Sequence, residues 1–168
     1  MNTLIAKKAT VYSLIIGAIL ALFGSFNFLM GLVSFALAVF VAPVVIFILQ
    51  KRNEIGFLDN QQGAAIGALS GFFATVSFFI IFTPITLFLN WLAPIIGSKI
   101  KFISTYHYSY GLTSLIRPDT LWVFGLIVIV IGILIALTNS ATGMGSTFLL
   151  SQFNKKPEDL EEIDIKIE

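Results

Sequence analysis

Three long stretches of this chain contain no ionisable side chain. Residues 9–50, 60–98 and 120–150 lack Asp, Glu, Lys, Arg and His, and together they make up two thirds of the 168 residues. A helix needs about 20 consecutive apolar residues to cross the hydrocarbon core of a bilayer. Only 11% of the chain is charged, whereas a soluble domain carries about 25% charged residues to keep its surface hydrated. The sequence therefore predicts an integral membrane protein and argues against an ordinary water-soluble enzyme.

The first charge-free stretch is long enough for two crossings joined by a tight turn. Gly24-Ser25-Phe26-Asn27 is the polar, turn-capable cluster near its middle, and residues of these types favour turns. We expect a helical hairpin with spans at about 9–24 and 28–49.

The other two stretches predict one span each. Residues 76–79 (Val-Ser-Phe-Phe) would have to form the turn of a second hairpin, but they are not turn-like, so we expect one long span at about 63–89. Pro84 is a place where that span can kink, because proline removes a backbone hydrogen bond. A fourth span is expected at about 121–140. The predicted fold class is an all-α bundle of four transmembrane helices, and a five-span arrangement is the alternative.

Lys and Arg placement predicts the orientation, because cytoplasmic segments carry the excess of these residues. With four spans and the N-terminus inside, seven basic residues are cytoplasmic and three lie outside. Both termini are then cytoplasmic, and the five-span alternative gives the same ratio. We expect one transmembrane domain (1–153), a short acidic cytoplasmic tail (154–168) and insertion in the plasma (inner) membrane. An outer interfacial segment at about 90–120 would hold most of an aromatic belt, formed by Trp91, Tyr106, Tyr108, Tyr110 and Trp122.

Gly63, Gly67 and Gly71 recur every four residues at the start of the third span. Small residues at this spacing form a smooth helix face that another backbone can approach closely. We interpret them as a helix-packing face, which binds either the chain's own spans or an external partner.

Composition gives little support to catalysis or to bound cofactors. The chain has no cysteine and one histidine, His107, whereas most protein metal sites need two to four donors. The expected spans contain no ionisable residue, and ion-coupled transporters and intramembrane hydrolases usually need such groups in the membrane. The net charge of +1 gives no reason to expect nucleic-acid binding. We expect a protein that is not an enzyme and that binds no cofactor or metal, with His107 in an aromatic interfacial loop.

The tail ends in a strictly alternating segment, in which Ile163, Ile165 and Ile167 are separated by charged residues. Alternation is typical of a strand with one apolar face, and a lone strand can add to the sheet edge of a partner. Disorder is the competing interpretation of so short a tail.

Two functional hypotheses follow from these features. The first is a non-enzymatic accessory or assembly subunit that acts through helix contacts in the bilayer, with another membrane protein or a second copy as partner. The alternative is a homo-oligomeric pore, permease or lipid-handling protein. In that case polar residues of the spans would line a path between subunits, namely Ser70, Ser77, Asn90, Thr138, Asn139 and Ser140.

Overall fold

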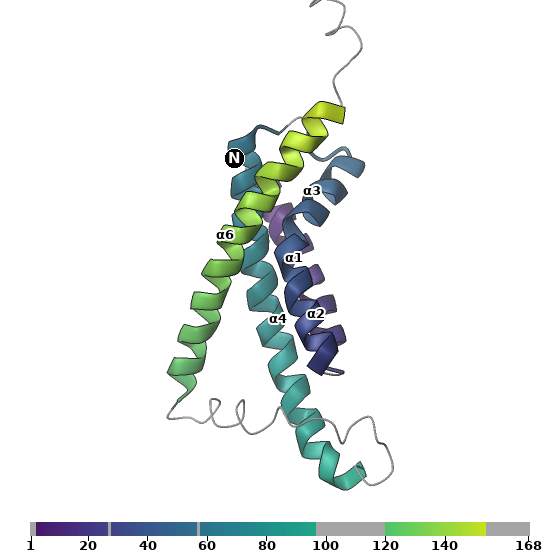
Figure 1. The fold of residues 1–168 in the computed structure, drawn as a ribbon, viewed down its shortest axis with the longest axis vertical. Coiled ribbons are helices and arrows are strands. Elements are labelled where there is room, and N and C mark those ends of the chain that lie inside the picture. Colours follow the sequence, from purple (N-terminus) through teal and green to yellow (C-terminus); the bar gives the residue numbers. More distant parts are fainter. Residues whose placement is uncertain (1–2, 27, 57, 97–119, 154–168) are drawn as a thin grey trace, which may run out of the picture.

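The computed structural model describes residues 3–26, 28–56, 58–96 and 120–153. Throughout these residues the only regular structure is helical (Figure 1), in the elements α1 (Thr3–Gly24), α2 (Phe28–Leu37), η1 (Ala38–Phe40), α3 (Val41–Lys51), α4 (Asn60–Ile96) and α6 (Leu121–Phe153). Four helical stretches within them are long and apolar enough to cross a membrane: Thr3–Gly24, Leu29–Lys51, Asn60–Leu89 and Leu121–Ser151. The all-helical prediction with four such helices is confirmed.

The helices are longer than the predicted spans. α1 begins at Thr3, α4 continues through Pro84 to Ile96, and α6 continues to Phe153. The expected spans were limited to the lengths that hydrocarbon requires, but a helix satisfies its own backbone hydrogen bonds and can extend into the headgroup region. Residues 90–96 of the expected outer segment are therefore helical, and residues 97–119 lie outside the described part.

The connection after α3 is fixed by a Schellman-type helix end. The Asn53 N–H donates to the Gln50 carbonyl at 2.8 Å, and the Glu54 N–H donates to the Leu49 carbonyl at 3.0 Å. Asn53 has a φ of 54°, the left-handed conformation that this motif requires and that Asn tolerates better than most residues. These bonds end α3 and turn the chain towards α4. There Asp59 Oδ1 accepts the Gln62 N–H at 2.6 Å and caps the new helix.

Helix α4 lies at the centre of the bundle and packs closely on α1 through small residues. The buried residues of α1 recur nearly every turn and are all small: Ala9, Ser13, Gly17, Ala21 and Gly24. A Cβ atom at Gly17 would overlap the carbonyl group of Ala74, so the two backbones are in direct contact there. Ser77 Oγ donates across the same interface to the Leu14 carbonyl at 2.7 Å.

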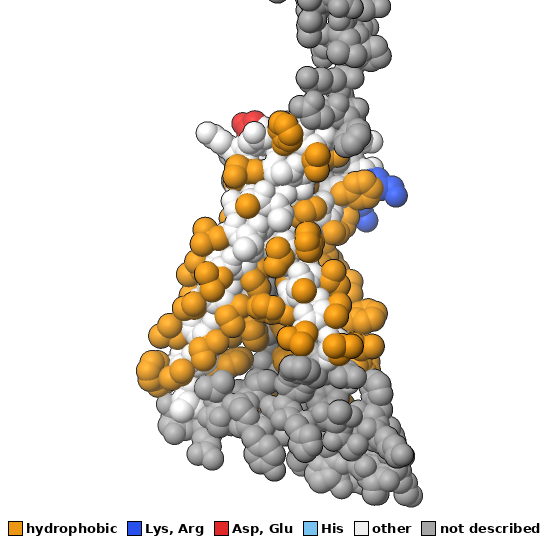
Figure 2. Space-filling view, in the orientation of Figure 1, with side chains coloured by type: hydrophobic (Ala, Val, Ile, Leu, Met, Phe, Trp, Pro, Cys, Tyr) orange, Lys and Arg blue, Asp and Glu red, His pale blue; other side chains and the backbone are white. Residues whose placement is uncertain are grey.

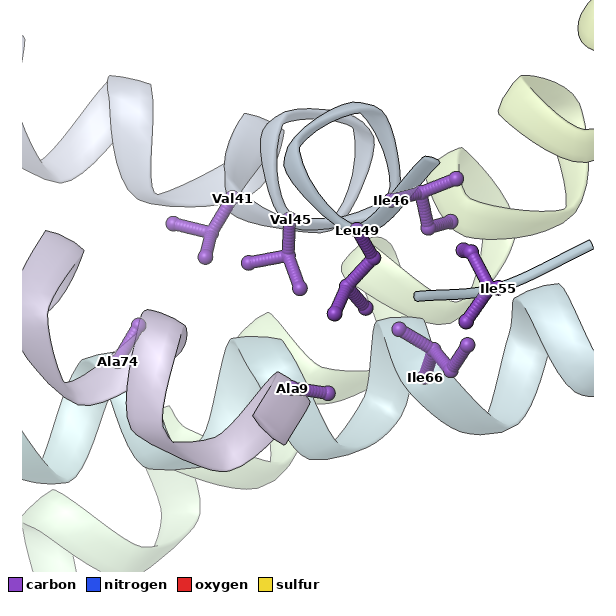
Figure 3. Packing of buried hydrophobic residues seen from close by; sticks show 8 residues of the cluster. All are labelled: Ala9, Val41, Val45, Ile46, Leu49, Ile55, Ile66 and Ala74. Atoms are coloured by element: carbon purple, nitrogen blue, oxygen red, sulfur yellow. The ribbon is translucent and has the colours of Figure 1, made fainter. Parts of the chain in front are cut away.

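A cluster of buried apolar side chains fills the space between α1, α3 and α4. In Figure 3 the side chains that α3 contributes point towards the neighbouring helices, and Ile66 of α4 lies beside Ile55. The cluster consists of Ala9, Val41, Val45, Ile46, Leu49, Ile55, Ile66 and Ala74. It explains why the second span is the most buried of the four, with 39% of its most apolar window enclosed.

The outer surface of the described helices is apolar along most of its length. Figure 2 shows hydrophobic side chains over most of the visible face, with the charged groups near one end. Large exposed side chains come from every span, among them Phe23, Leu29, Ile80 and Leu137. Water-soluble monomers rarely expose apolar surface on this scale, so the four apolar helices suggest a membrane-embedded protein.

Helices α4 and α6 cross at the charged end and separate towards the other end (Figure 1). Glycines line the close half of the contact, whereas phenylalanines lie between the helices in the open half. Phe72 contacts Gly132 there, and the rings of Phe79 and Phe124 lie 6.2 Å apart edge to face. Only 11% of the most apolar window of α6 is buried.

Candidate functional site

The second span is interrupted in its middle. Helix α2 ends at Leu37, the 3-10 turn η1 follows, and α3 starts at Val41 after Phe40 with φ −103° and ψ 13°. Pro43 is the third residue of α3, a position where a proline is tolerated because the first N–H groups of a helix have no intrahelical partner. The interruption leaves backbone N–H and C=O groups that must find partners elsewhere, because a buried backbone group without a partner is costly in free energy.

Asn139 of α6 supplies those partners with one carboxamide. Its Oδ1 accepts the Ala42 N–H at 2.8 Å, and its Nδ2 donates to the Ala38 carbonyl at 2.8 Å. Ala38 and Ala42 are four residues apart, so the carboxamide takes the place of the helical hydrogen bond between them. Nδ2 also donates to the Ile135 carbonyl of its own helix at 3.0 Å. Asn139 thus caps both ends of the interruption and is completely buried.

A second side chain of α6 supports the same interruption. Thr142 Oγ1 lies 3.3 Å from the Val39 carbonyl and 3.1 Å from the Asn139 carbonyl. The Val39 carbonyl would accept from residue 43 in a continuous helix, and Pro43 has no N–H to give. We call the set of Asn139, Thr142, Ala38, Val39 and Ala42 the Asn139 junction.

The predicted glycine face of α4 packs against α6 next to the Asn139 junction. Gly63, Gly67 and Gly71 of α4 all face α6 of the same chain. A Cβ at Gly67 would overlap the Asn139 carbonyl oxygen, and a Cβ at Gly71 would lie 2.9 Å from Asn139 Nδ2. Close approach of α4 therefore holds α6 against the interrupted span.

The polar residues that were expected to line a path lie in several different environments. Ser70 and Asn139 are buried, Ser77 is buried against α1, and Thr138 is exposed and donates to carbonyls of its own helix. Ser140 is half-buried beside Gly67, and Asn90 lies in the last part of α4, where side chains are not described. The structure does not bring the five residues with described side chains onto one common face.

Several predicted residues fall outside the described part of the chain. They are Tyr106, His107, Tyr108 and Tyr110 of the outer segment and Ile163, Ile165 and Ile167 of the tail. Trp91 lies in α4 with its side chain undescribed, and Trp122 stands in the first turn of α6 with 70% of its surface exposed. Since α4 leads to the end of the bundle where α6 begins, the two tryptophans belong to the same end.

The charged side chains of the described residues gather at the opposite end, where α1 begins, α3 ends and α4 begins. They are Lys7, Lys8, Lys51, Arg52, Glu54 and Asp59. Lys8 Nζ lies 3.1 Å from Glu54 Oε1, and the Arg52 guanidinium lies 5.4 Å from the ring centroid of Tyr12. Both contacts link α1 to the segment that ends α3. Within the described ranges, no group of three or more His, Cys, Asp or Glu residues is placed to hold a metal ion.

Comparison of the chain with protein-family models, curated proteins and solved structures finds no match.

The Asn139 junction was not expected from the sequence. Asn139 was expected only as one of the polar residues of a path, and no role was expected for Pro43 or Thr142. The available signal was a proline near the middle of a long apolar stretch, together with an asparagine in another such stretch. A buried carboxamide in a membrane helix needs partners, and backbone freed near a proline is a common source of them.

Proposed function

We propose that the protein is a non-enzymatic integral membrane protein that acts as an accessory or assembly subunit through helix contacts with another membrane protein. The observation that carries this proposal is the sparse packing of α6. Its half near the Asn139 junction is held by α4 and α3, whereas its other half diverges from α4 (Figure 1) and exposes residues such as Trp122, Leu126 and Leu134. A helix anchored over half its length presents the other half to a neighbour in the bilayer.

Most of the interior polar side chains support a structural role for the spans, although the buried Ser70 and Thr83 hydroxyls have no hydrogen-bond partner among the described residues. Asn139 is engaged with the backbone of the second span, Ser77 with α1, and Thr75 and Thr86 with carbonyls one turn back in α4. Hydroxyls and carboxamides that are already bonded to backbone are poorly suited to line a water-filled path. For this reason the alternative of a homo-oligomeric pore, permease or lipid-handling protein receives less support.

The proposed orientation places both termini in the cytoplasm and the protein in the plasma (inner) membrane. Four of the six described charged residues are Lys or Arg, and all six lie at the end that this orientation makes cytoplasmic. The seven-to-three distribution of Lys and Arg over the whole sequence points the same way.

The proposal is tested by the mass of the tagged protein extracted from its native membrane in mild detergent. We expect a complex that contains a second polypeptide in fixed ratio. Gly125→Leu should release that polypeptide, because Gly125 lies in the diverging half of α6 and a Cβ there meets no described atom within 4 Å. Gly145→Leu is the matched control, since Gly145 is equally open but lies in the half of α6 near the charged end. Recovery of the chain only alone or as a homo-oligomer would refute the accessory role.

A further inference from the structure

A shallow groove runs along the outer face of α1 at the charged end of the bundle. Its lining includes Leu4, Lys7, Lys8, Val11 and Tyr12, which share one helix face by their spacing of three and four residues. Leu4 and Val11 are exposed apolar side chains. Two lysines therefore lie beside apolar side chains on the outer surface of α1, and Tyr12, which packs against the core cluster, forms the inner edge of the groove.

The electrostatic balance around this groove is positive. The described residues at this end carry four basic and two acidic side chains. Glu54 is paired with Lys8, and Asp59 caps α4 through Gln62. Lys7 is exposed and forms no ion pair with a described residue, and the Arg52 guanidinium lies over the Tyr12 ring at the edge of the groove.

We infer that this groove binds the headgroup of an anionic phospholipid. The phosphate would lie at Lys7, and an acyl chain would follow Leu4 and Val11. Arg52, whose guanidinium lies over the ring of Tyr12 in the groove lining, would add to the attraction. Basic side chains at the cytoplasmic face attract anionic headgroups with about 1 kcal/mol each, equivalent to about five-fold in affinity. The aliphatic stems of the lysines can lie along apolar surface while the ammonium groups reach the phosphate.

The arrangement fits a lipid better than free inorganic phosphate. A phosphate site in water usually surrounds the anion with several directed donors, whereas this groove combines exposed cations with apolar walls. The inference rests on the proposed location in a membrane, and on the proposed orientation that places this end in the anionic cytoplasmic leaflet.

The test is native mass spectrometry of the full-length protein released from micelles that contain phosphatidylglycerol and phosphatidylcholine with identical acyl chains. We expect the protein to retain phosphatidylglycerol preferentially. Lys7→Gln should lower the retained phosphatidylglycerol about five-fold. Lys51→Gln is the matched control: it removes the same charge from an exposed position at the same end, outside the groove lining, and should change retention much less.

Three results would overturn the inference: equal retention of the two lipids by the unchanged protein, equal effects of the two substitutions, or displacement of phosphatidylglycerol by millimolar inorganic phosphate. Alkaline carbonate extraction of cell membranes separates this inference from the proposal on which it rests. Protein that stays in the membrane pellet but shows no lipid preference refutes the lipid site alone. Protein that is extracted into the supernatant refutes the membrane location as well.

Discussion

Replacing Asn139 with leucine should weaken the bundle at its centre. Leucine resembles asparagine in branching at Cγ but is somewhat larger and cannot form hydrogen bonds, so the substitution removes the bonds to the Ala42 N–H and the Ala38 carbonyl without leaving a cavity. Interhelical hydrogen bonds in membrane proteins contribute about 0.6 kcal/mol on average and up to about 1.7 kcal/mol. The two bonds together therefore predict a loss of about 1–3 kcal/mol in the free energy of unfolding, or roughly 5- to 150-fold in the equilibrium constant.

The loss can be measured by titrating the protein in mixed micelles with SDS and following the reactivity of one introduced thiol. The chain has no cysteine, and Val45→Cys places a thiol of similar size at a fully buried position of α3. Thr138→Val in the same background is the control, because Thr138 is the neighbour of Asn139 and, among the described residues, its hydroxyl donates only to carbonyls of its own helix. If Asn139→Leu and Thr138→Val shift the transition equally, Asn139 does not hold the interrupted span.

Two other interfaces give predictions of different size. Gly67→Leu should prevent native packing of α4 on α6, because a Cβ at Gly67 would overlap the Asn139 carbonyl and lie 3.0 Å from the Ser140 Cα. These backbone atoms cannot move aside without separating the helices, and overpacking of this kind costs about 1–3 kcal/mol or more. Normal protection of the thiol in that variant would contradict the close contact. Ser77→Ala removes one interhelical hydrogen bond, to the Leu14 carbonyl, so it should lower the free energy of unfolding by about 0.6 kcal/mol in the same titration. A loss as large as that of Gly67→Leu would contradict this estimate for a single hydrogen bond.

The sequence predicted the helical architecture because a bilayer limits the possible structures severely. Charge-free stretches of sufficient length must form helices there, since every backbone group needs an internal partner. The turn-forming residues 24–27 located the first hairpin turn: α1 ends at Gly24 and α2 begins at Phe28. The helix ends beyond the hydrocarbon were predicted less well, because hydrophobicity says nothing about how far a helix continues into the headgroup region.

The glycine face illustrates the limit of a local pattern. The spacing of Gly63, Gly67 and Gly71 indicates that another backbone can approach this face, but it does not name the neighbour. The structure places α6 of the same chain there. Internal packing and partner binding use the same small residues at the same spacing, so only the arrangement of the helices in space distinguishes them.

The sequence alone determined that this chain forms long apolar helices, where its charges gather and which helix faces are small enough for close packing. These properties depend on the composition and period of single segments. The tertiary structure decided that Asn139 caps an interruption almost a hundred residues earlier in the chain, and that α6 leaves α4 halfway along its length (Figure 1). Such features depend on which side chain of one helix lies beside the unsatisfied backbone of another, and the pattern within a single segment does not predict that contact.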